Sequence, residues 1–147
     1  FFEKELQCTT ALYSKGTESD APVLVYNSGR YGAPDGPIKG ANGTARVVSG
    51  AKLEVTFTPP SLGIYSPYWI VDLIGDANKG YQVSMVFSCN SILGITEVES
   101  FWILSRTPEL PAGVTYESLM EKATALGIDV SSLGVTMTTQ GGACQYY

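Results

Sequence analysis

The stretch Glu99-Ser-Phe-Trp-Ile-Leu-Ser-Arg-Thr-Pro108 decides the fold class of this chain. It alternates large apolar with small or polar residues and then stops at Thr-Pro, which is typical of one strand with one buried face. Its last charged residue is a lone arginine, Arg106. The stretch therefore predicts a β-fold whose sheet is dry on one side.

The same period of two recurs along most of the chain. Its clearest case is Lys52–Thr58, where Leu53, Val55 and Phe57 face one way and polar side chains face the other. A strand with one dry and one wet face suits the wall of a barrel or a sandwich. Turns rich in Gly and Pro separate the strands. We expect further strands at 8–14, 23–27, 43–48, 68–74, 81–88 and 135–139.

A different period near the C-terminus predicts one helix, at residues 115–126. Thr115 is a suitable N-cap residue, and Gly127 is a suitable stop after the last turn. We expect this helix to pack against the outside of a barrel. The apolar positions at helical spacing are Tyr116, Leu119, Met120, Ala123 and Leu126.

Composition narrows the function classes. The 147 residues fit a single domain over 1–147, and 44% apolar residues are enough for a core. A net charge of −5 argues against a nucleic-acid partner, because no basic stripe would displace counterions from phosphates. The chain contains no His, which removes the usual general base and the commonest metal ligand. We therefore expect no catalytic residue, no metal and no catalytic cofactor, and no apolar run is long enough for a transmembrane helix.

Several stretches together resemble the lipocalin family, most closely its apolipoprotein D-like and bacterial branch. They are Phe1–Tyr13, Pro67–Asp72, Trp102–Pro108 and the final Gly-Gly-Ala-Cys144. The resemblance implies an all-β fold, an eight-stranded antiparallel up-and-down barrel with one C-terminal α-helix on its outside. The Gly-x-Trp motif of the family's first strand is absent, and Phe2–Lys4 resembles the loop that follows that strand. The first strand is therefore expected to be missing or supplied by another segment.

The resemblance also assigns structural roles. In the family, the arginine that Arg106 matches stacks on the tryptophan of the first strand. Cys8 and Cys144 match positions that form a disulfide, whereas Cys89 matches a position that bridges to the family's N-terminal extension. Cys89 is therefore expected to be intermolecular or unpaired, since a buried inert thiol also fits it.

The same resemblance places a ligand cavity inside the barrel. Trp102 and Tyr13 match its inner wall, and the alternation adds the panel of Leu53, Val55 and Phe57, with Leu104 on the Trp102 face. Filling of an ordinary core is the competing interpretation of these side chains. The remaining expected ligand-binding residues are Tyr26, Asn27, Tyr68, Met85 and Phe87.

The function expected from the resemblance is a secreted carrier of a small hydrophobic molecule, such as a bilin, carotenoid, retinoid, sterol or fatty acid. Two alternatives stay open: a lipocalin-fold enzyme of the isomerase or de-epoxidase type, and a ligand-free interaction protein. No signal peptide is visible, so either the mature protein begins here or the start is missing. Asn42-Gly-Thr44 is an acceptor triplet for N-glycosylation. A disulfide-linked segment through Cys89 and a homo-oligomer are the expected partners besides the ligand.

Overall fold

The computed structural model describes residues 5–92, 94 and 96–146, which divide into two compact units. One unit holds the chain up to Val48, together with Glu54–Tyr65 and the C-terminal tail, residues 137–146. The other holds Ser49–Leu53 and Ser66–Thr136. Residues 1–4, expected to form the loop after the family's first strand, lie outside the described part of the chain.

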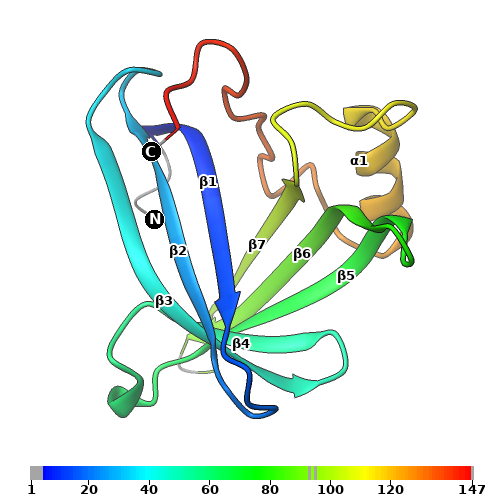
Figure 1. Ribbon diagram of the computed structural model, residues 1–147. Helices are drawn as coiled ribbons and strands as arrows, with labels where there is room; N and C mark the ends of the chain where they lie inside the picture. The colour runs from blue at the N-terminus through cyan, green and yellow to red at the C-terminus, as the bar shows by residue number, and fades with distance from the viewer. Residues whose placement is uncertain (1–4, 93, 95, 147) are drawn as a thin grey trace. The chain divides into compact units, whose positions relative to one another are not determined.

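In the described part of the chain, seven strands follow one another in sequence order, and each is hydrogen-bonded to the next (Figure 1). The strand pairs β1–β2, β2–β3, β5–β6 and β6–β7 are antiparallel, which confirms the expected all-β class. A short 3-10 turn, Pro60–Leu62, follows β4. The strands are β1 Leu6–Lys15, β2 Val23–Tyr31, β3 Ile38–Ser49, β4 Lys52–Thr56, β5 Ser66–Asp76, β6 Gly80–Ile92 and β7 Thr96–Ser105.

Strand β3 begins at Ile38, earlier than its sequence predicts, and residues 38–42 pair with β2. Two aromatic rings pack on its glycines. A Cβ atom at Gly40 would lie 2.5 Å from the Tyr26 hydroxyl oxygen, and one at Gly43 would lie 2.8 Å from the Phe57 ring. Each ring covers a position where a strand glycine offers no side chain. Gly40 and Gly43 are therefore the positions at which the Tyr26 and Phe57 rings cover strand β3.

The helix α1, Tyr116–Ala125, confirms the predicted helix and both of its end signals. The Thr115 hydroxyl accepts a hydrogen bond from the backbone N–H of Ser118, and the Ser118 hydroxyl accepts one from the backbone N–H of Thr115, both at 3.1 Å. This reciprocal pair satisfies two backbone donors at the start of the helix. Gly127 follows the helix with a φ of 86°, the left-handed conformation that glycine adopts without strain.

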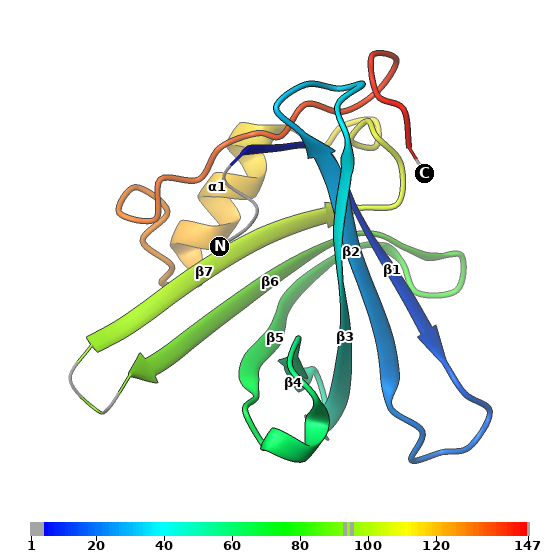
Figure 2. The ribbon, with the colours of Figure 1, turned by 90° about the vertical axis from the view of Figure 1, so that its left-hand side faces the viewer.

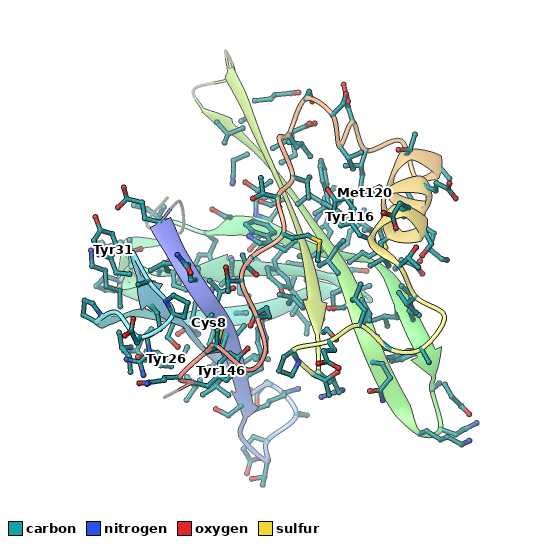
Figure 3. All side chains as sticks on the ribbon, turned by 90° about the horizontal axis from the view of Figure 1, so that it is seen from above. Cys8, Tyr26, Tyr31, Tyr116, Met120 and Tyr146 are labelled. Carbon is teal, nitrogen blue, oxygen red and sulfur yellow. A yellow bond between two sulfur atoms is a disulfide. The ribbon has the colours of Figure 1, made fainter. Side chains whose placement is uncertain are left out.

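Helix α1 covers one face of the strands in its own unit, as both ribbon views show (Figures 1 and 2). Leu119 and Ala123 pack on Val83 and Met85 of β6, and all four side chains are buried. Met120 and Tyr116 project from α1 (Figure 3), and Met120 is partly buried against the same cluster. Tyr116 donates a hydrogen bond to the Val135 carbonyl. At the edge of this contact, Lys122 forms a 3.1 Å ion pair with Asp72.

The strand expected at 135–139 is not formed. The segment has no regular structure, and the Thr139 carbonyl accepts one hydrogen bond from the Cys8 N–H at 2.9 Å. Cys8 sits at an irregularity of β1 with a φ of 54°, so the ladder is interrupted where the tail approaches. A bulge locally disrupts the ladder of β1, and the described tail makes individual hydrogen bonds there without forming a strand.

Candidate functional site

Strands β6 and β7 present two chemically different faces in the second unit. Residues directly opposite in an antiparallel pair share a face, and successive residues alternate between faces. Met85 opposes Ile103, and both belong to the cluster under α1. Val86 opposes Trp102, so these two side chains lie on the face turned away from the helix.

Met85 and Phe87 are corrections to the expected ligand-binding set. Met85 has no exposed surface, and it packs in the core with Leu119 and Ala123 of α1. Phe87 packs against the same cluster. The alternation showed that these residues share a face, but it did not show that the helix covers that face. They are core residues of the contact between helix and sheet.

The face turned away from α1 collects four of the expected residues of this unit. Leu104 opposes Ser84 and lies beside Trp102 by alternation. Trp69 opposes Phe87 on the helix side, so its neighbour Tyr68 lies on the other face. Lys52 lies 4.4 Å from the centre of the Trp69 ring and is therefore on the helix side. Leu53, the next residue, lies on the face turned away from α1. All four are partly exposed: Leu53, Tyr68, Trp102 and Leu104.

A second group of expected residues shares one face in the first unit. Tyr13 opposes Val25, and Val25 opposes Gly43, whose surface the Phe57 ring covers. Asn27 lies two residues along β2 from Val25, on the same face.

The buried Ala45 opposes Val23 on the Tyr13 face, so its neighbour Arg46 lies on the other face. Glu54 forms a 2.8 Å ion pair with Arg46 and therefore shares that other face. Val55, the next residue, returns to the Tyr13 face and joins this group. Together these residues form the candidate face of the first unit, namely Tyr13, Asn27, Val55 and Phe57.

Asn27 carries the polar feature of this face. Its side-chain oxygen Oδ1 is buried and has no hydrogen-bond partner within the described part of the chain. A buried acceptor without a donor costs roughly 1–3 kcal/mol of desolvation free energy. A ligand that donates a hydrogen bond would recover this cost.

Tyr26 is the third correction. It opposes Leu12 and Asn42, and its ring lies over Gly40, so it faces away from Tyr13 and Asn27. Adjacent strand residues alternate, so Tyr26 and Asn27 do not line one cavity from the same strand. Asn42 is exposed on the Tyr26 side, where its glycosylation stays a prediction.

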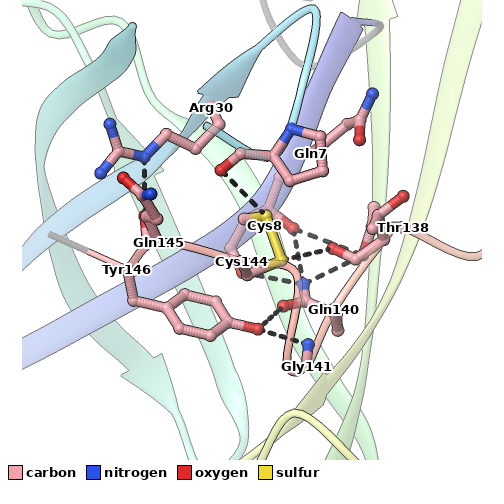
Figure 4. Close-up of a disulfide and its surroundings, with 12 residues drawn as sticks. Gln7, Cys8, Arg30, Thr138, Gln140, Gly141, Cys144, Gln145 and Tyr146 are labelled. Atoms are coloured by element: carbon pink, nitrogen blue, oxygen red, sulfur yellow. Dashed lines mark hydrogen bonds between the residues drawn. A yellow bond between two sulfur atoms is a disulfide. The ribbon is translucent and has the colours of Figure 1, made fainter. Parts of the chain in front are cut away.

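The expected disulfide between Cys8 and Cys144 is present, with the two Cα atoms 5.4 Å apart (Figure 4). Hydrogen bonds hold the tail on both sides of it. Arg30 donates from Nε to the Gln145 carbonyl at 2.6 Å, and Gln140 donates to the Thr9 carbonyl at 3.0 Å. Because its sulfur is in the disulfide, Cys8 is not available as a thiolate nucleophile.

Cys89 is unpaired, as expected, and lies beside two carboxylates on the β6–β7 pair. Its thiol and the carboxylates of Glu97 and Glu99 have ligand atoms within 4.8 Å of one another. Partial burial raises the pKa of the Cys89 thiol, and the two negative charges raise it further. The thiolate is therefore disfavoured, and a bond from Cys89 to another segment stays a prediction.

Arg106 anchors the end of β7 to the start of β6. Its Nε donates to the Tyr81 carbonyl at 2.7 Å, and its backbone N–H donates to the Gln82 carbonyl at 3.0 Å. This anchoring is a structural role. Stacking on a tryptophan of the first strand stays a prediction, because that motif is absent from the chain.

Comparison with known proteins identifies the family. A family model described as a lipocalin-like domain matches residues 1–138. The chain belongs to the lipocalin family. Its curated relatives include apolipoprotein D of Mus musculus, 34% identical over 139 residues, and of Macaca fascicularis, 32% identical over 137 residues. Each match covers 92% of this chain but 66% of the relative, so the chain spans just under two thirds of their length.

Solved structures show the same lipocalin fold. Lobster apocrustacyanin A1 matches with a TM-score of 0.65 at 18% identity, over 95% of this chain and 69% of that chain. Apocrustacyanin C1 matches with the same values. At this identity the likeness concerns the fold alone. None of the helices in the described residues is long and apolar enough to cross a membrane.

Proposed function

We propose that this lipocalin is a non-enzymatic carrier that binds a small hydrophobic molecule, and that it acts outside the cell. One observation carries the proposal: in the second unit, helix α1 covers one sheet face, and Trp102, Leu104 and Tyr68 lie on the other face. A large aromatic side chain there supplies rigid apolar contact area to a ligand. Membership of the lipocalin family supports the same use of this face, and we propose that residues 1–147 act as one lipocalin-like domain.

The ligand is proposed to be ring-bearing or conjugated. Trp102, on the face of the second unit that carries the proposal, favours flat apolar molecules such as bilins, carotenoids, retinoids and sterols over a plain alkyl chain. In the first unit, a separate candidate face with Tyr13, Phe57 and the buried Oδ1 of Asn27 is proposed to accept a ring-bearing molecule that carries a hydroxyl or N–H group. Burial of apolar ligand surface supplies the affinity, at about 25 cal/mol per Å².

Protein purified from its natural source tests this proposal. Native mass spectrometry should show a bound molecule of a few hundred daltons that leaves on denaturation, and a pigment would add a visible absorption band. The same spectrum would report a segment linked through Cys89 and any homo-oligomer. Source protein without a ligand, combined with no binding of retinol, bilirubin, a carotenoid, progesterone or arachidonic acid, would contradict the proposal.

A further inference from the structure

A cavity of about 480 Å³ lies within the first unit. It forms where the β1–β2 connection, the second half of β3 and the segment from Pro60 to Tyr65 meet. Lys15 and Val47 come from the strand face of Tyr13, whereas Thr44 and Arg46 come from the other face. The cavity therefore lies at the strand ends, where both faces of the strands contribute to its lining, and it contains none of Tyr13, Asn27, Val55 and Phe57.

Two cations line this cavity, and both retain free donors. Lys15 donates from Nζ to the Ser19 carbonyl at 3.2 Å and has no further partner within the described residues. Arg46 is held in place, because Nε and Nη2 bind Glu54 at 3.1 and 2.8 Å. Its guanidinium also lies 4.1 Å from the centre of the Tyr65 ring, and its Nη1 is left without a bond in this part of the chain.

Apart from Asp20, the remaining wall is apolar or neutral. Pro22, Pro60 and Val47 supply apolar surface, and the sequence from Val55 to Val71 contains no charged residue. Asp20 is the carboxylate that lines the cavity, and Glu54 occupies part of Arg46 from outside. Both negative charges oppose an anion in the cavity.

We propose that this cavity binds the anionic head of a small amphiphile, a phosphate or carboxylate joined to an apolar chain. Lys15 and the free Nη1 of Arg46 bind the head, since a charge-assisted hydrogen bond to an oxyanion is roughly twice as strong as one between neutral groups. The prolines and Val47 contact the first carbons of the chain. Glu54 competes with the head for Arg46, and this competition makes the proposal sharply testable.

Octyl phosphate, kept below its micelle concentration and followed by amide chemical shifts, is the direct test. Shifts should concentrate at Ser19, Thr44 and Val47. Lys15→Gln should weaken binding roughly fivefold or more, because it removes a positive charge from the site. Glu54→Gln should instead tighten binding roughly two- to fivefold, because Arg46 is released for the ligand. Lys79→Gln, in the β5–β6 turn, is the control with the same charge change and should have no effect.

The other ligands separate the sources of the head group. Inorganic phosphate should bind more weakly than octyl phosphate, and octanol should cause no shifts at these residues. If the protein binds phosphatidic acid vesicles and octyl phosphate releases it from them, the head group belongs to a membrane lipid. If the protein binds octyl phosphate but not the vesicles, the ligand is a free amphiphile. Both results support the site.

The proposal is overturned if Lys15→Gln and Glu54→Gln shift the affinity in the same direction or leave it unchanged. If either variant fails to fold, shifts of the unmodified protein decide: shifts confined to other residues, or octanol binding equal to octyl phosphate binding, overturn it. None of these readouts depends on the proposed hydrophobic ligand, so the two proposals fail separately.

Discussion

At the scale of single residues, small changes of environment decide which side chains are available for chemistry. Cys89 illustrates this, because its thiol is free while burial and two carboxylates disfavour its reactive form. Asn27 is the opposite case, because its buried Oδ1 has no hydrogen-bond donor among the described residues and can accept a hydrogen bond from a ligand. Neither property is visible in the sequence, where both residues lie in ordinary strand patterns.

The pKa of Cys89 gives a pH-dependent prediction. Burial and the charges of Glu97 and Glu99 raise this pKa, so alkylation by iodoacetamide should reach half its maximal rate at a higher pH than for a free cysteine. The double variant Glu97→Gln, Glu99→Gln should lower the midpoint and speed alkylation at pH 8. A midpoint unchanged by the double variant would show that the carboxylates do not act on the thiol.

Gly43 gives a stability prediction. Gly43→Ala places a Cβ 2.8 Å from the Phe57 ring and 2.9 Å from the Thr56 carbonyl, so a ring or a backbone must move. The free energy of unfolding should fall by about 1–3 kcal/mol, measured by urea denaturation. Gly142→Ala is the control, because a Cβ there meets nothing within 4 Å. Equal stability of the two variants would contradict the packing of Phe57 on β3.

At the scale of elements, the described contacts explain how the tail is held on β1. The tail reaches the interrupted part of β1 through the Cys8–Cys144 disulfide and a few hydrogen bonds, without forming a strand. The sequence separation of the two cysteines is 136 residues, so the cross-link restricts most of the unfolded chain. The tail is therefore attached by covalent restraint more than by its own structure.

Cys144→Ser should destabilise the protein strongly. The chain-entropy model for so long a loop predicts a loss of roughly 4–5 kcal/mol, seen as a lower urea midpoint. Reduction of the unmodified protein should produce a similar loss, and reduction of the variant should change little further. A variant as stable as the oxidised protein would show that the tail hydrogen bonds suffice without the cross-link.

At the scale of the whole molecule, strand patterns and end signals of the helix were predictable because each depends on local sequence. The ends of α1 follow from Thr115 and Gly127, and the family follows from stretches spread along the chain. The side of the sheet that α1 covers depends on contacts distant in sequence, so the alternation alone does not exclude Met85 and Phe87 from the ligand-binding set. The cavity of Lys15 and Arg46 is not predictable from local sequence either, since three separate segments form it.

The two tryptophans test directly whether the sheet face turned away from α1 binds the ligand. Trp102 lies on that face, whereas Trp69 lies on the helix side beside Lys52. Binding of retinol, or of the ligand found in source protein, should be titrated for Trp102→Ala and Trp69→Ala. We expect Trp102→Ala to weaken binding by about 2 kcal/mol, roughly thirtyfold, with little change in the Tm of the empty protein, and Trp69→Ala to bind normally. Unchanged affinity in folded Trp102→Ala, or an equal loss in both variants, would contradict binding at this face.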